Sequence, residues 1–298
     1  MNAVITVPSS LDDLSFEQVL DQVAAHPPDA TLLLDARRTR WATPYGLTAL
    51  LALAQSREKR PTLTVPELDK TASYWATAGF FHHAESLYDL AGAYPKRPAG
   101  HHSNVLLGVT PVAKSDDVHS VVDRIQESAK TILTTQLNLD PKATLRFTMM
   151  LSELCQNIVE HAGQPGWVCV QTYTWTQRLG RKVAVIAVSD PGAGFRQSLE
   201  STPSFMPPSR WDDGAALEMA VIQGTSRFRD RGRGHGLAES RRYLRQWDGK
   251  LSVRSGTARI AISPDWDQDV PLKRDLAPFT GSHVQAIIPE RVAQETGR

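Results

Sequence analysis

Three short groups of residues in this chain have types and spacings that could bind ions or small ligands. In the segment SELCQNIVEHA, Glu153, Asn157 and His161 follow one another at intervals of four residues. Side chains four residues apart share one side of an α-helix, so we expect these three to form a polar row. A carboxylate and a carboxamide one turn apart can hold a water molecule and Mg²⁺, which prefers oxygen ligands. Taken alone, the same row is also typical of a solvated helix face.

The second group is DPGAGF, which directly follows an apolar run ending at Ser189. An aspartate at the end of a strand, here Asp190, can accept a hydrogen bond from an exocyclic amine. Gly192 and Gly194 allow a tight turn and let the backbone approach a flat ring. The alternative for this group is an ordinary turn after a strand.

The third group is GRGHGL, at the start of an expected helix. Gly232, Gly234 and Gly236 leave backbone amides uncovered at a helix N-terminus, which is a ready site for phosphate groups. Arg233 and His235 alternate with these glycines, where their side chains can reach a phosphate or face solvent. A glycine-rich turn alone is a weak signal, so the order of the three groups matters more than any one of them.

The surrounding pattern predicts the elements that would bring these groups together. Asp140 and Pro141 form a favourable helix start, because aspartate caps free amides and proline is tolerated at the first helical position. An apolar stripe is expected on a different side of this helix from the polar row; it consists of Phe147, Leu151, Leu154 and Ile158. The long polar segment 195–231 is expected to be a lid or a disordered loop. The expected strands are 105–109, 167–175, 182–189, 251–253, 259–262 and 283–288, the expected helices are 118–137 and 236–247, and residues 263–282 are expected to be an inserted loop.

In this order, the three groups resemble the GHKL ATPase family, to which DNA gyrase and the histidine kinases belong. The resemblance covers about residues 104–290 and includes the final strand, GSHVQAIIP. It implies the Bergerat fold, an α/β sandwich that binds ATP with Mg²⁺. By this resemblance Glu153 is the general base and Asn157 ligates Mg²⁺. His161 matches a histidine of the anti-sigma serine kinases, although it could instead simply cap the helix.

The same resemblance gives roles to the two glycine-containing groups. Asp190 would bind the adenine amine, with Gly192 and Gly194 as the floor beneath the base. The phosphates would lie on the third group, which consists of Gly232, Arg233, Gly234, His235 and Gly236. The segment that leads from the preceding helix to SELCQNIVEHA is short, and in this it is most similar to the corresponding segment of the anti-sigma serine kinases. His119, on the preceding helix, lacks the acidic residue and arginine that follow the acceptor in histidine kinases.

The N-terminal domain is expected at residues 1–95. It ends at a boundary near 92–103, where glycine and proline interrupt the helical and strand periodicity of the apolar residues. Short apolar runs alternate with helical stretches, which indicates a small α/β domain; the expected strands are 4–7, 31–35 and 62–65, and the expected helices are 16–25, 45–57 and 68–78. The segment 32–55 resembles a STAS domain, the fold of anti-sigma antagonists. Phosphorylatable members carry serine or threonine before Gly-Leu, where this chain has Tyr45. We therefore expect this domain to dock or regulate rather than accept phosphate. Trp41 and Tyr45 would form an aromatic contact surface or pack against the domain's own sheet.

The composition of the chain limits the classes of function and of partner that remain. The 298 residues suffice for two domains, and 41% of them are hydrophobic. A formal net charge of +1 gives no electrostatic argument for nucleic acid or a membrane as a partner. The sequence contains neither a signal peptide pattern nor an apolar run of ~18 residues, so we expect a cytoplasmic protein. Cys155 and Cys169 lack a metal-ligand spacing, and we expect both to be buried.

Two functions of different classes follow from these expectations. The first is a Mg²⁺-dependent ATPase or serine/threonine kinase of anti-sigma type in bacterial partner switching. Glu153 favours it, because a pure binding module needs no base. The second is a nucleotide-gated interaction module with little turnover, which the missing acceptor serine favours. The partner would be a regulatory protein, such as a STAS antagonist or a sigma-like factor. The sequence leaves two further possibilities open: that the protein forms a homodimer, and that the N-terminal domain binds a small ligand.

Overall fold

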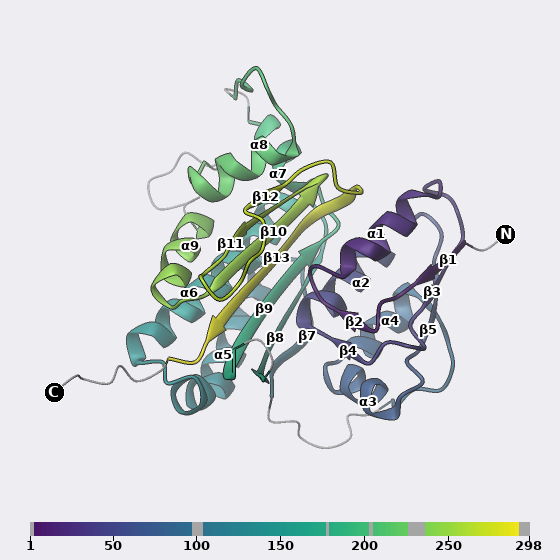
Figure 1. The fold of residues 1–298 in the computed structure, drawn as a ribbon, viewed down its shortest axis with the longest axis horizontal. Helices are drawn as coiled ribbons and strands as arrows, with labels where there is room; N and C mark the ends of the chain where they lie inside the picture. The colour runs from purple at the N-terminus through teal and green to yellow at the C-terminus, as the bar shows by residue number, and fades with distance from the viewer. Residues whose placement is uncertain (1–2, 97–103, 177–178, 203–204, 226–235, 292–298) are drawn as a thin grey trace.

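The computed structural model describes residues 3–96, 104–176, 179–202, 205–225 and 236–291 (Figure 1). Its first part is a parallel sheet with the strand order β1-β3-β5-β6, in which helices connect the strands. The strands are β1 (Ala3–Thr6), β3 (Leu32–Asp35), β5 (Thr62–Thr64) and β6 (Asp89–Ala91), and the helices are α1 (Phe16–Ala24), α2 (Pro44–Gln55), α3 (Asp69–Thr77) and α4 (Phe80–Leu87). A short parallel pair is formed by β2 (Ser10–Leu11) and β4 (Trp41–Ala42). Strands and helices therefore alternate here, as the sequence pattern predicts.

The second part is built on an antiparallel seven-stranded sheet with the order β12-β11-β10-β13-β9-β8-β7. Its strands are β7 (Val105–Val112), β8 (Gly166–Trp175), β9 (Arg181–Asp190), β10 (Lys250–Gly256), β11 (Ala258–Ile262), β12 (Leu272–Lys273) and β13 (Phe279–Pro289). Its helices are α5 (Ser115–Gln136), α6 (Pro141–Asn157), α7 (Gly194–Glu200), α8 (Asp213–Leu217) and α9 (Gly236–Gln246), with π-helical turns η1 (Ile158–Ala162) and η2 (Glu218–Ile222). The architecture is the expected α/β arrangement of helices packed on a sheet.

Helices α5, α6 and α9 cover one face of the large sheet (Figure 1). Helix α6 begins as expected, because an Asp140 carboxylate oxygen accepts a hydrogen bond of 2.7 Å from the Ala143 amide and Pro141 occupies the first turn. Its apolar side chains Phe147 and Leu151 are fully buried against the sheet. This packing fixes the position of the polar residues at the C-terminal end of α6.

The opposite face of the large sheet is covered by the helices of the N-terminal part (Figure 1). Helix α2 lies between the two sheets and contacts β8, β9 and β13. Its sequence, PYGLTALLALAQ, is apolar on all sides, and every residue from Pro44 to Ala54 is buried. A helix that is hydrophobic all round requires a covered environment, and the second sheet supplies it.

The expectation of an aromatic contact surface at the start of α2 is wrong for Tyr45. The Tyr45 side chain is 1% exposed and packs edge-on against Phe16, with ring centroids 6.2 Å apart. Trp41 remains 41% exposed, and its ring stacks on Tyr74 while its edge meets Tyr173 of β8. Tyr45 is buried because α2 is enclosed between two sheets, so its hydroxyl is not presented to another molecule.

The expected loop at 195–231 is also wrong in the part that the structure describes. Helices α7 and α8 and the turn η2 occupy much of it. The Asp212 carboxylate caps α8 by accepting a hydrogen bond of 2.7 Å from the Ala215 amide. Leu217 and Val221 are fully buried in the same core as α6 and α9. The apolar side chains of DDGAALEMAVI therefore anchor a helical segment.

Residues 263–282, expected as an inserted loop, contribute β12 and the first residues of β13. Two aspartates of this segment neutralise a buried lysine of β10. The Lys250 ammonium lies 3.1 Å from Asp267 and 3.0 Å from Asp269, and all three side chains are buried. A buried lysine needs compensating carboxylates, and this segment supplies both of them, so it is a structural part of the sheet.

Cys155 and Cys169 are free and buried, as expected. Burial raises the pKa of both thiols to about 12, so neither is a reactive thiolate at neutral pH. None of the helices within the described ranges has both the length and the apolar character needed to cross a membrane.

Candidate functional site

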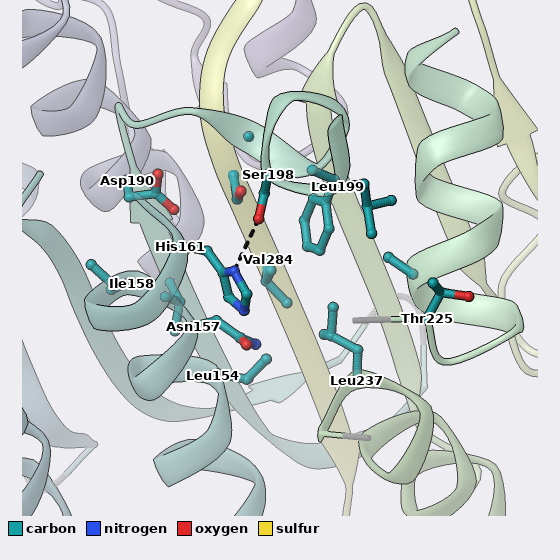
Figure 2. A pocket seen from close by; sticks show the side chains of 15 residues that line it. Leu154, Asn157, Ile158, His161, Asp190, Ser198, Leu199, Thr225, Leu237 and Val284 are labelled. Carbon is teal, nitrogen blue, oxygen red and sulfur yellow. Dashed lines mark hydrogen bonds between the residues drawn. The ribbon is translucent and has the colours of Figure 1, made fainter. Parts of the chain in front are cut away.

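A cavity lies where the end of α6, the turn η1, the ends of β9 and β13, and helix α7 meet (Figure 2). Its walls are mainly apolar, and Asn157, His161, Asp190 and Ser198 are among its few polar groups. The cavity volume is about 60 Å³. That is room for about five water molecules, whereas small-molecule sites typically measure about 300–1,000 Å³. Helix α7 forms one wall of this cavity.

Asp190 is the buried carboxylate of this cavity. It is the last residue of β9 and only 4% exposed. Burial raises its pKa to about 7, although hydrogen bonds from the Gly192 and Ser282 amides oppose the shift. The Gly192 amide donates to one carboxylate oxygen at 2.9 Å. A ligand that donates an amine hydrogen here would favour the ionised form and gain an interaction that water cannot easily replace.

The turn after Asp190 is packed too tightly for side chains. A Cβ on Gly192 would overlap the carbonyl oxygen of Ala162 in η1. Gly194 has a φ of +71° and lines the cavity. Gly281 has a φ of +85°, and a Cβ there would overlap the carbonyl oxygen of Asp190. Gly194 lines the cavity as expected for its floor, whereas Gly192 is not among the lining residues. The glycines bring β9, β13 and η1 into backbone contact.

The polar row of α6 is arranged differently from the expectation. Leu154, Asn157, Ile158 and His161 line the cavity, while Glu153 is not among the lining residues. These four positions follow the i, i+3, i+4, i+7 spacing of one helix face. The expected separation between apolar stripe and polar row is therefore wrong at this end, where the two share the cavity wall.

His161 does more than cap the helix. Helix α6 changes to the π-helical turn η1 after Asn157, and His161 lies in that turn. Its Nδ1 atom is 2.9 Å from the Ser198 hydroxyl of α7 (Figure 2). Single π-helical turns occur frequently at functional sites. The hydrogen bond joins the two walls of the cavity.

Glu153 lies next to the cavity on the side of α9. Its side chain is exposed, and its pKa is raised by partial desolvation and by the nearby carboxylates of Glu160 and Glu239. Glu239 belongs to the first turn of α9. A carboxylate with a raised pKa is suited to accept a proton near neutral pH. The role of Glu153 as a general base stays a prediction, which the raised pKa favours.

The glycine-rich group is only partly described. Gly232, Arg233, Gly234 and His235 lie outside the described residues, and α9 begins at Gly236. Leu237, the next residue, is buried and lines the cavity (Figure 2). The N-terminal end of α9 is therefore beside the cavity, where a helix N-terminus can attract phosphate.

Sequence reasoning missed Phe195, Ser198, Leu199 and Thr225, which all line the cavity. They lie in the segment that was expected to be a loop. The signal for α7 is the pair Phe195 and Leu199, four residues apart, directly after a glycine turn.

Metal ligands are few in this region. Within the described ranges, no group of three or more histidine, cysteine, aspartate or glutamate residues is placed to hold a metal ion. Asn157 offers a side-chain oxygen at the cavity wall. Mg²⁺ usually takes one or two protein ligands and completes its shell with water and phosphate oxygens, so this donor set fits Mg²⁺ bound together with a nucleotide.

Comparison with known families agrees with this geometry. Residues 143–289 match the family described as "Histidine kinase-, DNA gyrase B-, and HSP90-like ATPase". The match runs from α6 to β13 and confirms the expected GHKL domain for that part of the chain. No curated protein matches the sequence.

Proposed function

We propose that the ATPase-family domain at residues 143–289 binds ATP in the cavity beside Asp190 and serves a signalling function. The observation that carries this proposal is the Asp190 carboxylate. It is buried at a strand end, next to a glycine turn, and opens into a mainly apolar cavity. A buried acceptor in apolar surroundings selects a flat ring that carries an amine, because a ring without the donor leaves the acceptor unpaired.

The two ends of the cavity suit the two ends of the nucleotide. Asp190 would accept a hydrogen bond from the adenine amine, and the apolar walls would pack against the ring. Asn157 and the N-terminus of α9 lie toward the other end, where phosphates and Mg²⁺ would be held. When bound, Mg²⁺ supplies charge neutralisation for the phosphates.

Glu153 supports an enzyme rather than a passive binding module. Its raised pKa and its position beside α9 fit a base that accepts a proton from water or from an acceptor hydroxyl. We propose a Mg²⁺-dependent ATPase or a protein serine/threonine kinase of anti-sigma type, in partner switching with a regulatory protein. The N-terminal domain would be STAS-like, and its helix α2 carries the buried Tyr45 at the usual acceptor position.

Entry of ATP requires α7 to move outward. The cavity volume of about 60 Å³ is smaller than that of a typical small-molecule site, and the Ser198–His161 hydrogen bond joins its two walls. A lid that must open before binding lowers the apparent affinity by the fraction of molecules that are open.

A nucleotide-gated interaction module is the second candidate. The observation that favours it is the extensive packing of the N-terminal domain on the ATPase-family domain, which gives nucleotide binding a route to a protein surface. In that case ATP would change the contacts of the protein without being consumed.

One experiment separates the candidates. The purified full chain is incubated with Mg²⁺ and ATP, and the products are analysed by mass spectrometry. Release of ADP without phosphate on any protein indicates an ATPase. Phosphate on the chain or on an added STAS partner indicates a kinase. Tight binding with neither product would identify the gated module, and no binding would reject ATP as the ligand.

A further inference from the structure

The contact between the N-terminal domain and the large sheet contains a buried hydrogen bond directly behind the adenine-binding residue. The Thr48 hydroxyl of α2 lies 3.0 Å from the Ser189 hydroxyl of β9, and both residues are 0% exposed. Because side chains alternate along a strand, Ser189 points to the N-terminal domain and Asp190 to the cavity. Thr48 therefore contacts the residue that precedes Asp190, from the opposite face of the sheet.

Ser189 depends on this partner. The Thr48 hydroxyl also lies 3.1 Å from the Pro44 carbonyl oxygen, to which it can donate its hydrogen. The Ser189 hydroxyl would then donate to Thr48. Within the described part of the chain, Thr48 is the only hydrogen-bond partner of the Ser189 side chain. A buried hydroxyl without a partner is costly, so the pair specifies how α2 sits on β9.

A second contact joins the same two domains at β10. The Arg254 guanidinium is fully buried and donates to both carboxylate oxygens of Glu17 in α1, at 2.9 and 3.4 Å. The next residue, Ser255, faces the other side of the sheet. Its hydroxyl donates to the Gly281 carbonyl at 2.7 Å and accepts from the Phe195 amide at 3.2 Å.

Gly281 connects this second contact to Asp190. Its Cα is pressed so closely against the Asp190 carbonyl that no side chain fits between them. Phe195, which Ser255 holds, is the second residue of α7. Contacts from α1 and α2 therefore reach both the adenine-binding strand end and the first turn of the helix that closes the cavity.

We infer that the N-terminal domain is an intramolecular regulatory partner: its docking on the large sheet positions Asp190, through Thr48–Ser189 and Glu17–Arg254, and is coupled to nucleotide binding. This inference rests on the proposed binding of ATP at Asp190. Coupling between two binding events is reciprocal, so docking strengthens nucleotide binding, and the nucleotide stabilises the docked domain by the same factor. A signal that loosens α1 or α2 would weaken ATP binding without touching the cavity.

The experiment compares four full-length proteins by isothermal titration with Mg²⁺ and a non-hydrolysable ATP analogue. Thr48→Val removes the hydroxyl at constant shape, and Thr48→Ser keeps it. Ile5→Val removes one methylene from the core of the N-terminal domain, in β1, which pairs with β3 and packs on α1. It controls for general destabilisation of that domain.

We expect Thr48→Val to weaken binding by about fivefold or more, and Thr48→Ser and Ile5→Val to stay within about twofold of the wild type. Glu17→Gln provides a second route: it keeps the shape but removes the charge opposite Arg254, and should weaken binding in the same direction. Amide exchange in α2 should slow when the analogue binds to the wild type, and slow less in Thr48→Val.

The outcomes separate this inference from the proposed function. If the wild type binds the analogue while Thr48→Val and Glu17→Gln bind it equally well, the coupling is rejected and ATP binding stands. Unchanged exchange of α2 on nucleotide binding would also reject the coupling. If the wild type does not bind the analogue, the proposed function fails and the inference fails with it.

Discussion

Ser198 of α7 and His161 of η1 meet across the cavity, with the serine hydroxyl 2.9 Å from Nδ1 of the histidine (Figure 2). Ser198 is buried and His161 is partly exposed, so the bond is part-buried. Helix α7 follows directly on the Asp190 turn, which η1 and β13 hold in place. The bond therefore joins α7 to η1 across the cavity, and we expect it to break when the proposed nucleotide binds.

Ser198→Ala should strengthen the binding of an ATP analogue. The substitution removes a hydrogen bond that exists only when α7 is closed, at a cost to the closed state of about 1 kcal/mol, or about fivefold in apparent affinity. Stopped-flow and equilibrium titrations measure the effect, which should appear mainly in the association rate. Gln197→Ala, at an exposed neighbouring position of α7, is the matched control. Weaker or unchanged binding in Ser198→Ala would show that α7 does not hold the cavity closed.

Much of the ATPase-family domain could be predicted from its sequence, because its signals are local. The Asp140–Pro141 start of α6, the apolar strands and the turn after Asp190 each follow from a few neighbouring residues. Helices α7 and α8 were missed because the prolines, serines and aspartates scattered through 195–231 were interpreted as a loop signal. The few apolar residues that anchor these helices, such as Leu217 and Val221, were given less weight in the prediction than the polar residues around them.

The packing of the two domains was not predictable from pattern alone. Helix α2 has no polar face, and that signal indicates a covered helix but does not name the covering surface. The pairings Thr48–Ser189 and Glu17–Arg254 join residues far apart in the chain. For the same reason Tyr45 was expected at a surface that the fold encloses.

Glu153→Gln should keep nucleotide binding and lose turnover. The amide keeps the shape of the side chain but cannot accept a proton, and loss of a general base typically costs about 10²–10⁴-fold in rate. ADP release is measured at saturating ATP. Glu160→Gln, which removes a neighbouring carboxylate, should reduce the rate far less. Equal hydrolysis by Glu153→Gln and wild type would remove Glu153 from the catalytic role.

Asn157→Ala should weaken binding only when Mg²⁺ is present. The carboxamide oxygen is the protein ligand proposed for the ion, and its loss removes one coordination bond from the nucleotide complex. Titrations with and without a chelator compare the two conditions. We expect the variant and the wild type to differ with Mg²⁺ and to agree without it. A difference that persists in chelator would assign Asn157 to direct nucleotide contact instead.

Asp190 should make stability fall as the pH rises. Its pKa is about 7 in the folded protein, against an ordinary value of 3.8, so the folded state keeps a proton that the unfolded state has already lost. Unfolding then releases a proton between these two values, and the free energy of unfolding decreases with pH until about 7. Asp190→Asn removes this contribution. Urea denaturation should show the variant gaining stability relative to the wild type from acid to neutral pH; parallel pH profiles would contradict the burial of an ionisable Asp190.

The most direct test of ATP binding at Asp190 is a calorimetric titration of wild type and Asp190→Asn with a non-hydrolysable ATP analogue and Mg²⁺. Asparagine can turn its carboxamide NH₂ group toward the adenine amine, so that two hydrogen-bond donors face each other. Such a buried mismatch costs about 1–3 kcal/mol, or about one to two decades in affinity. We predict saturable binding by the wild type and at least about tenfold weaker binding by the variant, with the fold unchanged by circular dichroism. An identical dissociation constant for the two proteins would contradict the assignment of Asp190 to the adenine.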